Sequence, residues 1–332
     1  MRSLTRVLVT GGAGFLGVHL CRRLLDCGVR VVSVDDLSTS VSDAGAELLT
    51  RSGYRFVRHS VCDPRLVGDI GDGFDTVFHL ASPASPVDYQ RMPIATLQAG
   101  AAGTATALAI AEDSGARLVL ASTSEVYGDP LEHPQDETYW GNVNPIGPRS
   151  VYDEAKRYAE ALVFAHRRER GADIAVARIF NTYGPGMRVN DGRMVPTFCT
   201  QALRGEPLTI TGTGSQTRSL CFVADTVNGL IALARSTFSG PVNIGNPVES
   251  TVLSVAELIR ELAGAVSPLR FLPSPADDPR RRCPDITLAR RVLGWHPVVG
   301  NAEGLSATLD WFRQTMKYPE AVGMSDGQRG RR

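Results

Sequence analysis

The sequence predicts an α/β protein built on a doubly wound parallel sheet, with a smaller C-terminal lobe. Roughly the first 180 residues alternate short β-branched runs with longer helical stretches, a pattern typical of a parallel sheet covered by helices on both faces. The later part contains more Gly and Pro and shorter elements, as in the segments YGPG and TGTG. This change of character indicates a second lobe.

Six strands are expected in the first part of the chain. Several are continuously apolar, as is typical of strands buried on both faces. They are expected at residues 6–10, 29–34, 55–59, 76–80, 117–121 and 174–179.

The domain boundaries follow from the same pattern. Residues 1–181 are expected to form the first domain, and the chain returns to it at about 219–246, where a strand end leads into a helix and a further strand follows. Residues 182–218 and 247–318 are expected to form the second lobe. The polar, Gly-containing end, 319–332, is expected to be a flexible tail.

Composition narrows the class of protein. The chain of 332 residues is 43% hydrophobic and 21% charged, which is typical of a globular protein. Lys+Arg and Asp+Glu both count 35, so no net charge favours a nucleic-acid partner. No apolar run approaches the roughly 20 residues of a membrane span, and no signal-peptide pattern opens the sequence. We therefore expect a cytoplasmic protein.

The six cysteines are scattered, without a CxxC pair or a nearby set of His ligands. This spacing disfavours both a disulfide framework and a structural zinc site, and free thiols in a reducing compartment are expected. No metal is predicted.

A glycine cluster follows the first expected strand. Gly12-x-Gly14-x-x-Gly17 fits the dinucleotide-binding fingerprint of a Rossmann-type fold, and Gly11-x-x-Gly14-x-x-Gly17 fits its short-chain variant. Glycines allow a tight turn and let backbone N–H groups approach a pyrophosphate. The alternative is a strand–helix turn with incidental glycines, but the strand before, the helix after and a downstream acid favour the fingerprint.

That acid is Asp35, about 20 residues on, at the end of the second expected strand. Its carboxylate can accept hydrogen bonds from the adenosine ribose. Its charge would repel a 2′-phosphate, so NAD is favoured over NADP.

A second motif lies in an expected helix at residues 149–170. Tyr152 and Lys156 are four residues apart and therefore share one helix face. A phenol ionises near pH ~10, and an adjacent ammonium together with the positive nicotinamide would lower that value toward the working range of a base. Alone, the pair could equally be a partly buried Tyr and a surface Lys, but after a dinucleotide fingerprint a catalytic role is favoured.

The motifs TGGAGFLG, STSEVYG and YDEAKR, in this order, resemble the extended short-chain dehydrogenase/reductase family. More narrowly, the sequence resembles the UDP-glucuronic acid decarboxylases, also called UDP-xylose synthases, from about residue 5 to residue 315. The segments that carry this resemblance are LASPASP, ASTSEVYGDP, YWGNVNPIGPRSVYDEAKR, VARIFNTYGP, NDGRMV and GSQTRSLCFV.

The resemblance implies a reaction. The family oxidises C4 of UDP-glucuronate with bound NAD, loses CO2 from the resulting β-keto acid, and reduces the 4-keto pentose to UDP-xylose. By the resemblance, Tyr152 would remove the O4 proton and Thr123 would hold that oxygen. Ser124 and Glu125 would lie near C5, and Lys156 would hold the nicotinamide ribose.

The resemblance also implies the ligand contacts. Arg193 would pair with the substrate carboxylate, and Asn181, Arg218 and Arg282 would contact the UDP portion. Tyr89 is a further substrate candidate, with packing as an equal alternative. The helix that bears Tyr152 often forms a dimer face in this family, so a homodimer is expected. The implied cofactor contacts are Gly11, Gly14, Phe15, Leu16, Gly17, Asp35, Leu80, Ala81, Ser82, Ser122, Tyr152 and Lys156.

Several positions depart from the family. Gln98 and Gly100 stand where the family usually carries Lys and Asn, and Gly186 replaces a usual Arg. Ala155 replaces a usual Gly, and Ser60 stands where an acid commonly meets the adenine. The Thr, Glu, Tyr, Lys and Arg set is intact, so these changes suggest altered cofactor retention or substrate tuning.

Three alternatives remain. A nucleotide-sugar 4,6-dehydratase usually has an Asp in the position of Ser124, which cannot serve as that acid. A 4-epimerase usually lacks a carboxylate at the position of Glu125. A non-catalytic NAD-binding protein would be free to lose Tyr152, Lys156 or Arg193, and all three are present.

Overall fold

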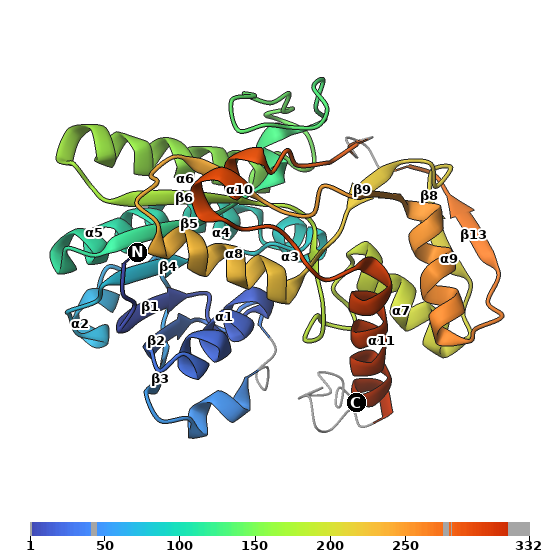
Figure 1. The fold of residues 1–332 in the computed structure, drawn as a ribbon, viewed down its shortest axis with the longest axis horizontal. Coiled ribbons are helices and arrows are strands. Elements are labelled where there is room, and N and C mark those ends of the chain that lie inside the picture. Colours follow the sequence, from blue (N-terminus) through green and yellow to red (C-terminus); the bar gives the residue numbers. More distant parts are fainter. Residues whose placement is uncertain (1, 41–44, 275–278, 280, 318–332) are drawn as a thin grey trace, which may run out of the picture.

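Residues 2–40, 45–274, 279 and 281–317 are described by the structure, a computed structural model shown in Figure 1. The expected tail at 319–332 lies outside the described residues.

One seven-stranded parallel sheet forms the centre of the molecule, in the order β11-β6-β5-β4-β1-β2-β3. This order confirms the predicted doubly wound fold. Most predicted bounds are within one residue, but β5 runs two residues further and includes Ser122 and Thr123. The strands are β1 Arg6–Thr10, β2 Arg30–Asp35, β3 Tyr54–Arg58, β4 Thr76–His79, β5 Arg117–Thr123, β6 Ile174–Ile179 and β11 Pro241–Ile244.

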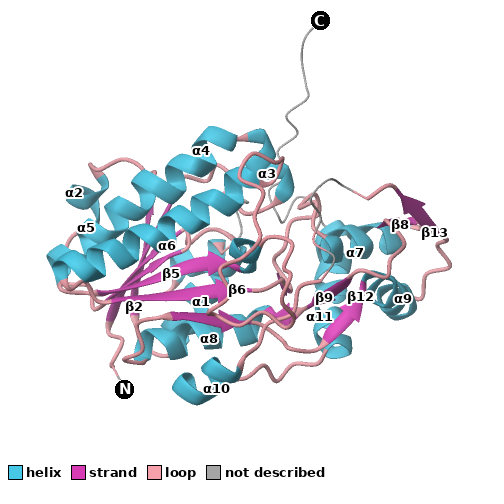
Figure 2. Cartoon of the chain, turned by 90° about the horizontal axis from the view of Figure 1, so that it is seen from above, coloured by secondary structure: helices cyan, strands magenta, loops and turns pink. Residues whose placement is uncertain are grey.

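Helices cover both faces of this sheet (Figure 2). Residues from each layer interlock with the continuously apolar strands in two separate hydrophobic cores. One face carries α2 Leu66–Ile70, α4 Pro93–Gln98, η2 Ala99–Gly103, α5 Thr104–Ser114 and α6 Ser150–Arg170. The other carries α1 Phe15–Asp26, α8 Val223–Arg235 and α10 Thr287–Leu293.

The helical stretch α4–η2–α5 corrects one expectation. Over Pro93–Ser114 it is long and apolar enough, by length and composition, to cross a membrane, although no such segment was expected from the sequence. Half of it is buried inside the protein, where α4 and α5 pack against α6. Because a buried core helix satisfies the same criterion, the stretch is weak evidence for a membrane span.

The second lobe lies beside the sheet domain (Figure 1) and has its own hydrophobic core. Phe15 and Phe222 pack against both this core and the sheet core, so the lobe adjoins the start of α1. Its elements are β7 Thr182–Tyr183, α7 Met194–Arg204, β8 Leu208–Thr211, β9 Thr217–Ser219, β10 Cys221–Phe222, β12 Glu249–Thr251, α9 Val252–Ala263, β13 Leu269–Leu272 and α11 Asn301–Lys317.

The chain returns to the sheet domain a second time, which the expected boundaries missed. Residues 247–318 were assigned to the second lobe, yet Ile286, Ala289 and Trp295 are buried in the core beneath the sheet. The indole Nε1 of Trp295 donates to the carbonyl of Asp225 in α8, at 3.1 Å. Apolar residues around α10 therefore bring this segment back across the first domain.

Candidate active site

The predicted site residues gather at one edge of the sheet, because the carboxyl ends of parallel strands meet there. The glycine turn follows β1, Leu80–Ser82 follows β4, and Asn181 follows β6. Thr123 ends β5 and leads into the short helix η3 Ser124–Tyr127, which holds Ser124 and Glu125. Tyr152 and Lys156 reach this edge from the first turns of α6.

The glycine turn has no room for larger residues. A Cβ on Gly11, whose φ is +72°, would lie 2.7 Å from the backbone nitrogen of Ala81, and one on Gly17 would lie 2.1 Å from the carbonyl oxygen of Gly11. Gly14 caps α1 without a side-chain hydrogen bond, and the first turn of the helix, which begins at Phe15 and Leu16, carries no acid. The first N–H groups of α1 are therefore available to an anion, as a dinucleotide pyrophosphate requires.

Asp35 holds this turn in place. Its Oδ2 accepts from the backbone N–H of Ala13 at 3.1 Å, and its Oδ1 accepts from that of Leu37 at 2.8 Å. Burial raises the pKa of Asp35, against these hydrogen bonds. The carboxylate therefore stabilises the cofactor loop itself, and its contact with a ribose stays a prediction.

Thr123, Tyr152 and Lys156 come together between β5 and α6. The phenol of Tyr152 lies close enough to the Thr123 hydroxyl for Thr123 to lower its pKa, and the Nζ of Lys156 donates to the carbonyl of Ala121 at 2.9 Å. The Nζ lies 5.8 Å from the centre of the Tyr152 ring. The structure thus assembles the three residues that the sequence assigned to O4 and the ribose.

The expected lowering of the Tyr152 pKa is not seen in the protein alone. Burial and the nearby Glu125 carboxylate raise this pKa, while the hydrogen bond from Thr123 and the charge of Arg193 act in the opposite direction. The ammonium of Lys156 is bound to Ala121, and burial lowers the Lys156 pKa to about 8. Without a further positive charge, Tyr152 therefore keeps its proton.

Glu125 is held between two arginines. Its Oε1 accepts from Arg282 Nη1 at 2.5 Å, and its Oε2 accepts from Arg282 Nη2 at 3.0 Å and Arg149 Nη2 at 2.8 Å. Burial alone would raise the Glu125 pKa, but the two guanidinium groups prevail and lower it to about 2. Glu125 is consequently an ionised, tightly oriented carboxylate.

This arrangement gives Arg282 a partner within the protein. Its guanidinium bonds to Glu125 and to the carbonyl of Gly128, at 3.3 Å, and its contact with the UDP portion, which the resemblance implied, stays a prediction. The residue is only 3% exposed, and a buried guanidinium requires a carboxylate partner. The Nε atoms of Arg282 and Arg149 are buried without a hydrogen-bond partner among the described residues, so both retain a donor for a ligand.

Tyr89 lies directly against the catalytic phenol. Its ring stacks on that of Tyr152, with centroids 5.4 Å apart and planes 8° apart. Its buried hydroxyl has no hydrogen-bond partner among the described residues, and burial raises its pKa to about 12. Tyr89 therefore packs against Tyr152 and also keeps a hydroxyl without a hydrogen-bond partner among the described residues. Its contact with a substrate stays a prediction.

The remaining substrate candidates lie around the second lobe. Arg193 precedes α7, pairs with Asp191 through Nη2 at 2.7 Å, and is close enough to Tyr152 to influence its pKa. Arg218, on β9, donates to the carbonyl of Thr217 at 2.8 Å. The carbonyl of Asn181 accepts from the N–H of Cys221 at 2.9 Å. Their contacts with a substrate stay predictions.

Ser122 and Ser124 are both buried at this edge. The hydroxyl of Ser122 donates to Glu160 at 2.6 Å, so the side chain is engaged with α6, and its contact with a cofactor stays a prediction. Ser82 follows β4, and its hydroxyl donates to Pro83 at 3.4 Å.

Arg149 and Asp153 were missed by the sequence reasoning. Arg149 directly precedes α6, where a positive charge is repelled by the positive end of the helix dipole. This unfavourable position is the feature of the sequence that could have indicated a functional role. Burial and the charge of Glu125 raise the pKa of Asp153 to about 7. Because Asp153 is only partly ionised near neutral pH, the two arginines are opposed by one full and one partial negative charge, and the cluster is net positive.

Two departures from the family form a single contact. A Cβ on Gly100 would lie 2.8 Å from the Cβ of Ala155 and 2.6 Å from its carbonyl oxygen. Both the backbone and the side chain of Ala155 therefore leave room only for glycine at position 100. Gly186 has a φ of +91°, and its Cβ position would face His19 Nε2 at 3.4 Å.

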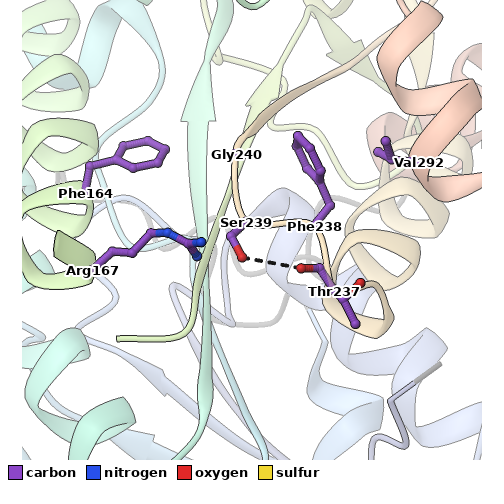
Figure 3. A pocket seen from close by; sticks show the side chains of 7 residues that line it. All are labelled: Phe164, Arg167, Thr237, Phe238, Ser239, Gly240 and Val292. Carbon is purple, nitrogen blue, oxygen red and sulfur yellow. Dashed lines mark hydrogen bonds between the residues drawn. The ribbon is translucent and has the colours of Figure 1, made fainter. Parts of the chain in front are cut away.

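A surface groove of about 600 Å³ lies away from this edge (Figure 3). The groove borders the amino end of β11, so it lies at the end of the sheet opposite the candidate site. It contains none of the predicted site residues. Its lining is Phe164, Arg167, Thr237, Phe238, Ser239, Gly240 and Val292. Elsewhere in the described part of the chain no cluster of His, Cys, Asp and Glu could hold a metal, and all six cysteines are free thiols.

Comparison with known proteins defines the class first. Residues 7–245 match the NAD dependent epimerase/dehydratase family, and the chain belongs to this family. This match confirms the predicted extended short-chain dehydrogenase/reductase class and its cofactor, NAD.

The narrower resemblance is confirmed as well. "UDP-glucuronic acid decarboxylase 1" of Danio rerio is 46% identical, over 97% of this chain and 78% of the relative. "UDP-glucuronic acid decarboxylase 3" of Arabidopsis thaliana is also 46% identical, over 95% of this chain and 91% of the relative.

Solved structures share the fold at lower identity. UDP-glucose 4-epimerase of Thermotoga maritima is 29% identical, with a TM-score of 0.87 over 94% of this chain and 100% of the other. UDP-glucuronic acid 4-epimerase of Bacillus cereus, solved with UDP-glucuronic acid and NAD, is 26% identical, with a TM-score of 0.83 over 93% and 99%. The fold therefore accommodates several reactions, and the site must distinguish them.

Proposed function

We propose that the protein converts UDP-glucuronate to UDP-xylose and CO2, with no net consumption of NAD. The observation that carries this proposal is the carboxylate of Glu125, held by Arg149 and Arg282 beside the Thr123–Tyr152 pair. Relatives with the decarboxylase name support it at 46% identity over nearly the whole chain.

The glycine turn, Asp35 and Lys156 would hold NAD, which when bound supplies reversible oxidation at C4 of the sugar. Tyr152 takes the proton of O4 during that oxidation, and Thr123 fixes the same oxygen by a hydrogen bond. The positive charge of the cofactor opposes the effects of burial and Glu125 on the Tyr152 pKa. Tyr152 returns the proton to O4 when the ketone is reduced.

Loss of CO2 uses the ketone at C4 as the electron acceptor. The C5–C6 bond breaks, and its electron pair forms a double bond between C5 and C4. The electrons of the C4 carbonyl move to O4, which becomes the enolate oxygen. Thr123 and Tyr152 stabilise this oxygen by hydrogen bonding. A proton added at C5 then restores the ketone. Glu125 is oriented to hold the water that supplies this proton, near the small side chain of Ser124.

Two cationic groups are candidates for the departing carboxylate. Arg193 was predicted for this role and suits a planar, bidentate ion pair. The net positive cluster of Glu125, Arg149 and Arg282 adds two unused Nε donors. Arg193→Ala should lower kcat/KM for UDP-glucuronate about a hundredfold, a typical cost of losing a charged contact. Unchanged turnover in a steady-state assay would assign the carboxylate to the arginine cluster alone.

The test of the function compares UDP-glucuronate with UDP-glucose in parallel incubations with NAD. We expect CO2 and UDP-xylose from UDP-glucuronate, with the sugar identified by mass spectrometry and NMR. The absorbance at 340 nm should stay constant, because no NADH accumulates. A dehydrated hexose formed from UDP-glucose without CO2 would overturn the assignment.

The proposed setting is a cytoplasmic homodimer that binds neither nucleic acid nor membranes. Six free thiols fit a reducing compartment, and the balanced charge fits a small-molecule substrate. Ile94 and Leu97 on α4 and Tyr158 on α6 are exposed apolar side chains on two helices that pack together. This surface supports a dimer, and light scattering of the wild type and of Tyr158→Glu tests it.

A further inference from the structure

Helix α6 contacts β5 through three side chains at four-residue intervals. Tyr152, Lys156 and Glu160 therefore lie along one stripe of the helix. Tyr152 meets Thr123 and Lys156 meets the carbonyl of Ala121, whereas Glu160 has so far been given no function. It occupies the third position of the stripe, away from the reacting atoms.

Glu160 binds both central strands. Its Oε1 accepts from the Ser122 hydroxyl at 2.6 Å and from Arg178 Nε at 3.0 Å, and its Oε2 accepts from Arg178 Nη2 at 2.8 Å. Ser122 and Arg178 are register partners on β5 and β6. One carboxylate thus fixes two neighbouring strands to the helix that carries the catalytic pair.

The same network continues beyond Thr123. Arg178 Nη1 donates to the Tyr127 hydroxyl at 3.0 Å, and this hydroxyl donates to Asn243 Oδ1 on β11 at 2.8 Å. Tyr127 closes η3, the turn that contains Glu125. The segment Ser122–Tyr127 is therefore held at both ends, and Thr123 and Glu125 lie between the two attachments.

Charge links Glu160 to Lys156 as well. Burial lowers the pKa of Lys156 to about 8, and the carboxylate of Glu160 opposes this effect. The other titratable groups that face Lys156 are Tyr152 on α6 and His79 on β4. Burial lowers the His79 pKa to about 3, and its ring bonds to Thr10 and Thr104, so it is neutral. Glu160 is therefore the anion that favours an ammonium at Lys156.

We propose that Glu160 is a positioning residue, which aligns Thr123, Tyr152 and Lys156 by binding β5 and β6 to α6 and places a carboxylate one helical turn from Lys156. Glu160 touches neither substrate nor cofactor and acts only through these residues. The inference deepens the proposed function and rests on it for its kinetic consequence.

The central variant is Glu160→Gln, which keeps the size and one acceptor oxygen but removes the charge. We expect kcat for UDP-glucuronate to fall at least about tenfold, with KM changed less than about twofold, because alignment rather than binding is lost. The alkaline limb of the kcat profile should move to lower pH by about one unit, as Lys156 loses its ammonium more readily.

Glu112→Gln is the matched control. Glu112 binds the distal end of α6 through His166 at 2.7 Å and Arg170 at 3.3 Å. The substitution therefore removes a similar helix-bound carboxylate far from the site. Its kcat and pH profile should equal those of the wild type.

A titration in the free protein separates this inference from the reaction. The 13Cε signal of Lys156, assigned by its loss in Lys156→Arg, should titrate near pH 8 in the wild type and at lower pH in Glu160→Gln. This readout holds even if the wild type does not decarboxylate UDP-glucuronate, a result that would refute the proposed function alone. An unshifted titration, or a kcat profile lowered equally at every pH, overturns the role of Glu160.

Ser122→Ala covers the case in which Glu160→Gln does not fold. It removes one hydroxyl and keeps the carboxylate with Arg178, so we expect a lowered kcat with an unchanged Lys156 titration. Wild-type kcat in this variant would contradict the alignment role.

Discussion

The candidate active site has two halves, one that would bind the cofactor and one that would carry the chemistry, and they are formed by different parts of the chain. Around Gly11–Gly17 the surface is backbone, and Asp35 serves to hold that backbone in place. Around Glu125 the surface is made of charged side chains that arrive from three separate segments. The cofactor half requires glycines, because a side chain there would fill the space next to the backbone. The chemical half requires ion pairs between residues that are distant in the sequence. The two halves should therefore fail in different ways when altered.

The largest effect is expected at the phenol. Tyr152→Phe keeps the stack on Tyr89 but removes the group that exchanges the O4 proton, so kcat should fall by about a thousandfold. NAD affinity, measured by calorimetry, should stay within about twofold. A kcat within tenfold of the wild type would assign the proton transfer to another group.

Glu125→Gln should weaken the fold as well as the reaction. Removing the charge leaves the buried guanidinium of Arg282 and the partly buried guanidinium of Arg149 without a carboxylate, at a cost of about 3 kcal/mol in the free energy of unfolding.

The pH dependence of this difference follows from the lowered Glu125 pKa. A carboxylate whose pKa falls from 4.5 to about 2 on folding stabilises the protein above pH 4.5 and loses that stabilisation as pH falls toward 2. Urea unfolding at pH 7 and at pH 3.5 should show a smaller difference between wild type and variant at the lower pH. An equal difference at both would contradict the charged pair.

The cofactor half is tested by two glycines with different surroundings. Gly17→Ala would place its Cβ 2.1 Å from the Gly11 carbonyl oxygen, so we expect a loss of roughly 2 kcal/mol in stability together with NAD affinity. The nearest atom to a Cβ on Gly14 is the same oxygen at 3.2 Å, so Gly14→Ala should keep most of its stability and lose mainly NAD affinity. Calorimetry and thermal melting distinguish the two, and equal melting temperatures would show that the turn is not tightly packed.

Asp35→Asn should have the smallest effect. The amide oxygen can still accept from one of the two backbone N–H groups, that of Ala13 or that of Leu37, so one hydrogen bond is lost. Because burial raises the Asp35 pKa, the charge itself adds no stability at neutral pH. NAD affinity should fall about tenfold and NADP affinity should rise, because the repelling charge is gone. Wild-type preference for NAD over NADP would rule out contact with the ribose.

The same contrast explains what the sequence could predict. The strands β1 and β6 agree with their predicted bounds, and Gly11–Gly17 with Asp35 form one local βαβ unit whose spacing is visible in the chain. The family resemblance supplied Thr123, Tyr152 and Lys156, which the structure brings together.

Long-range pairing could not be predicted in the same way. Glu125 and Arg282 are 157 residues apart, and nothing local to Arg282 shows that its partner is a catalytic carboxylate. The part of the Tyr152 pKa expectation that rested on Lys156 was wrong for a related reason, since the carbonyl of Ala121 binds the Lys156 ammonium. The part that rested on the nicotinamide stays a prediction. The return of α10 to the sheet domain likewise depends on packing with α8.

The most direct test follows the carboxyl carbon of the substrate. With UDP-[6-13C]glucuronate, a decarboxylase releases the label as CO2 and bicarbonate, whereas a UDP-glucuronic acid 4-epimerase, whose fold this chain shares, retains it in the sugar. We expect 13C NMR to show bicarbonate appearing in equal amount to UDP-xylose, with no change in absorbance at 340 nm. A label that stays at C6 of a hexuronate would contradict the account.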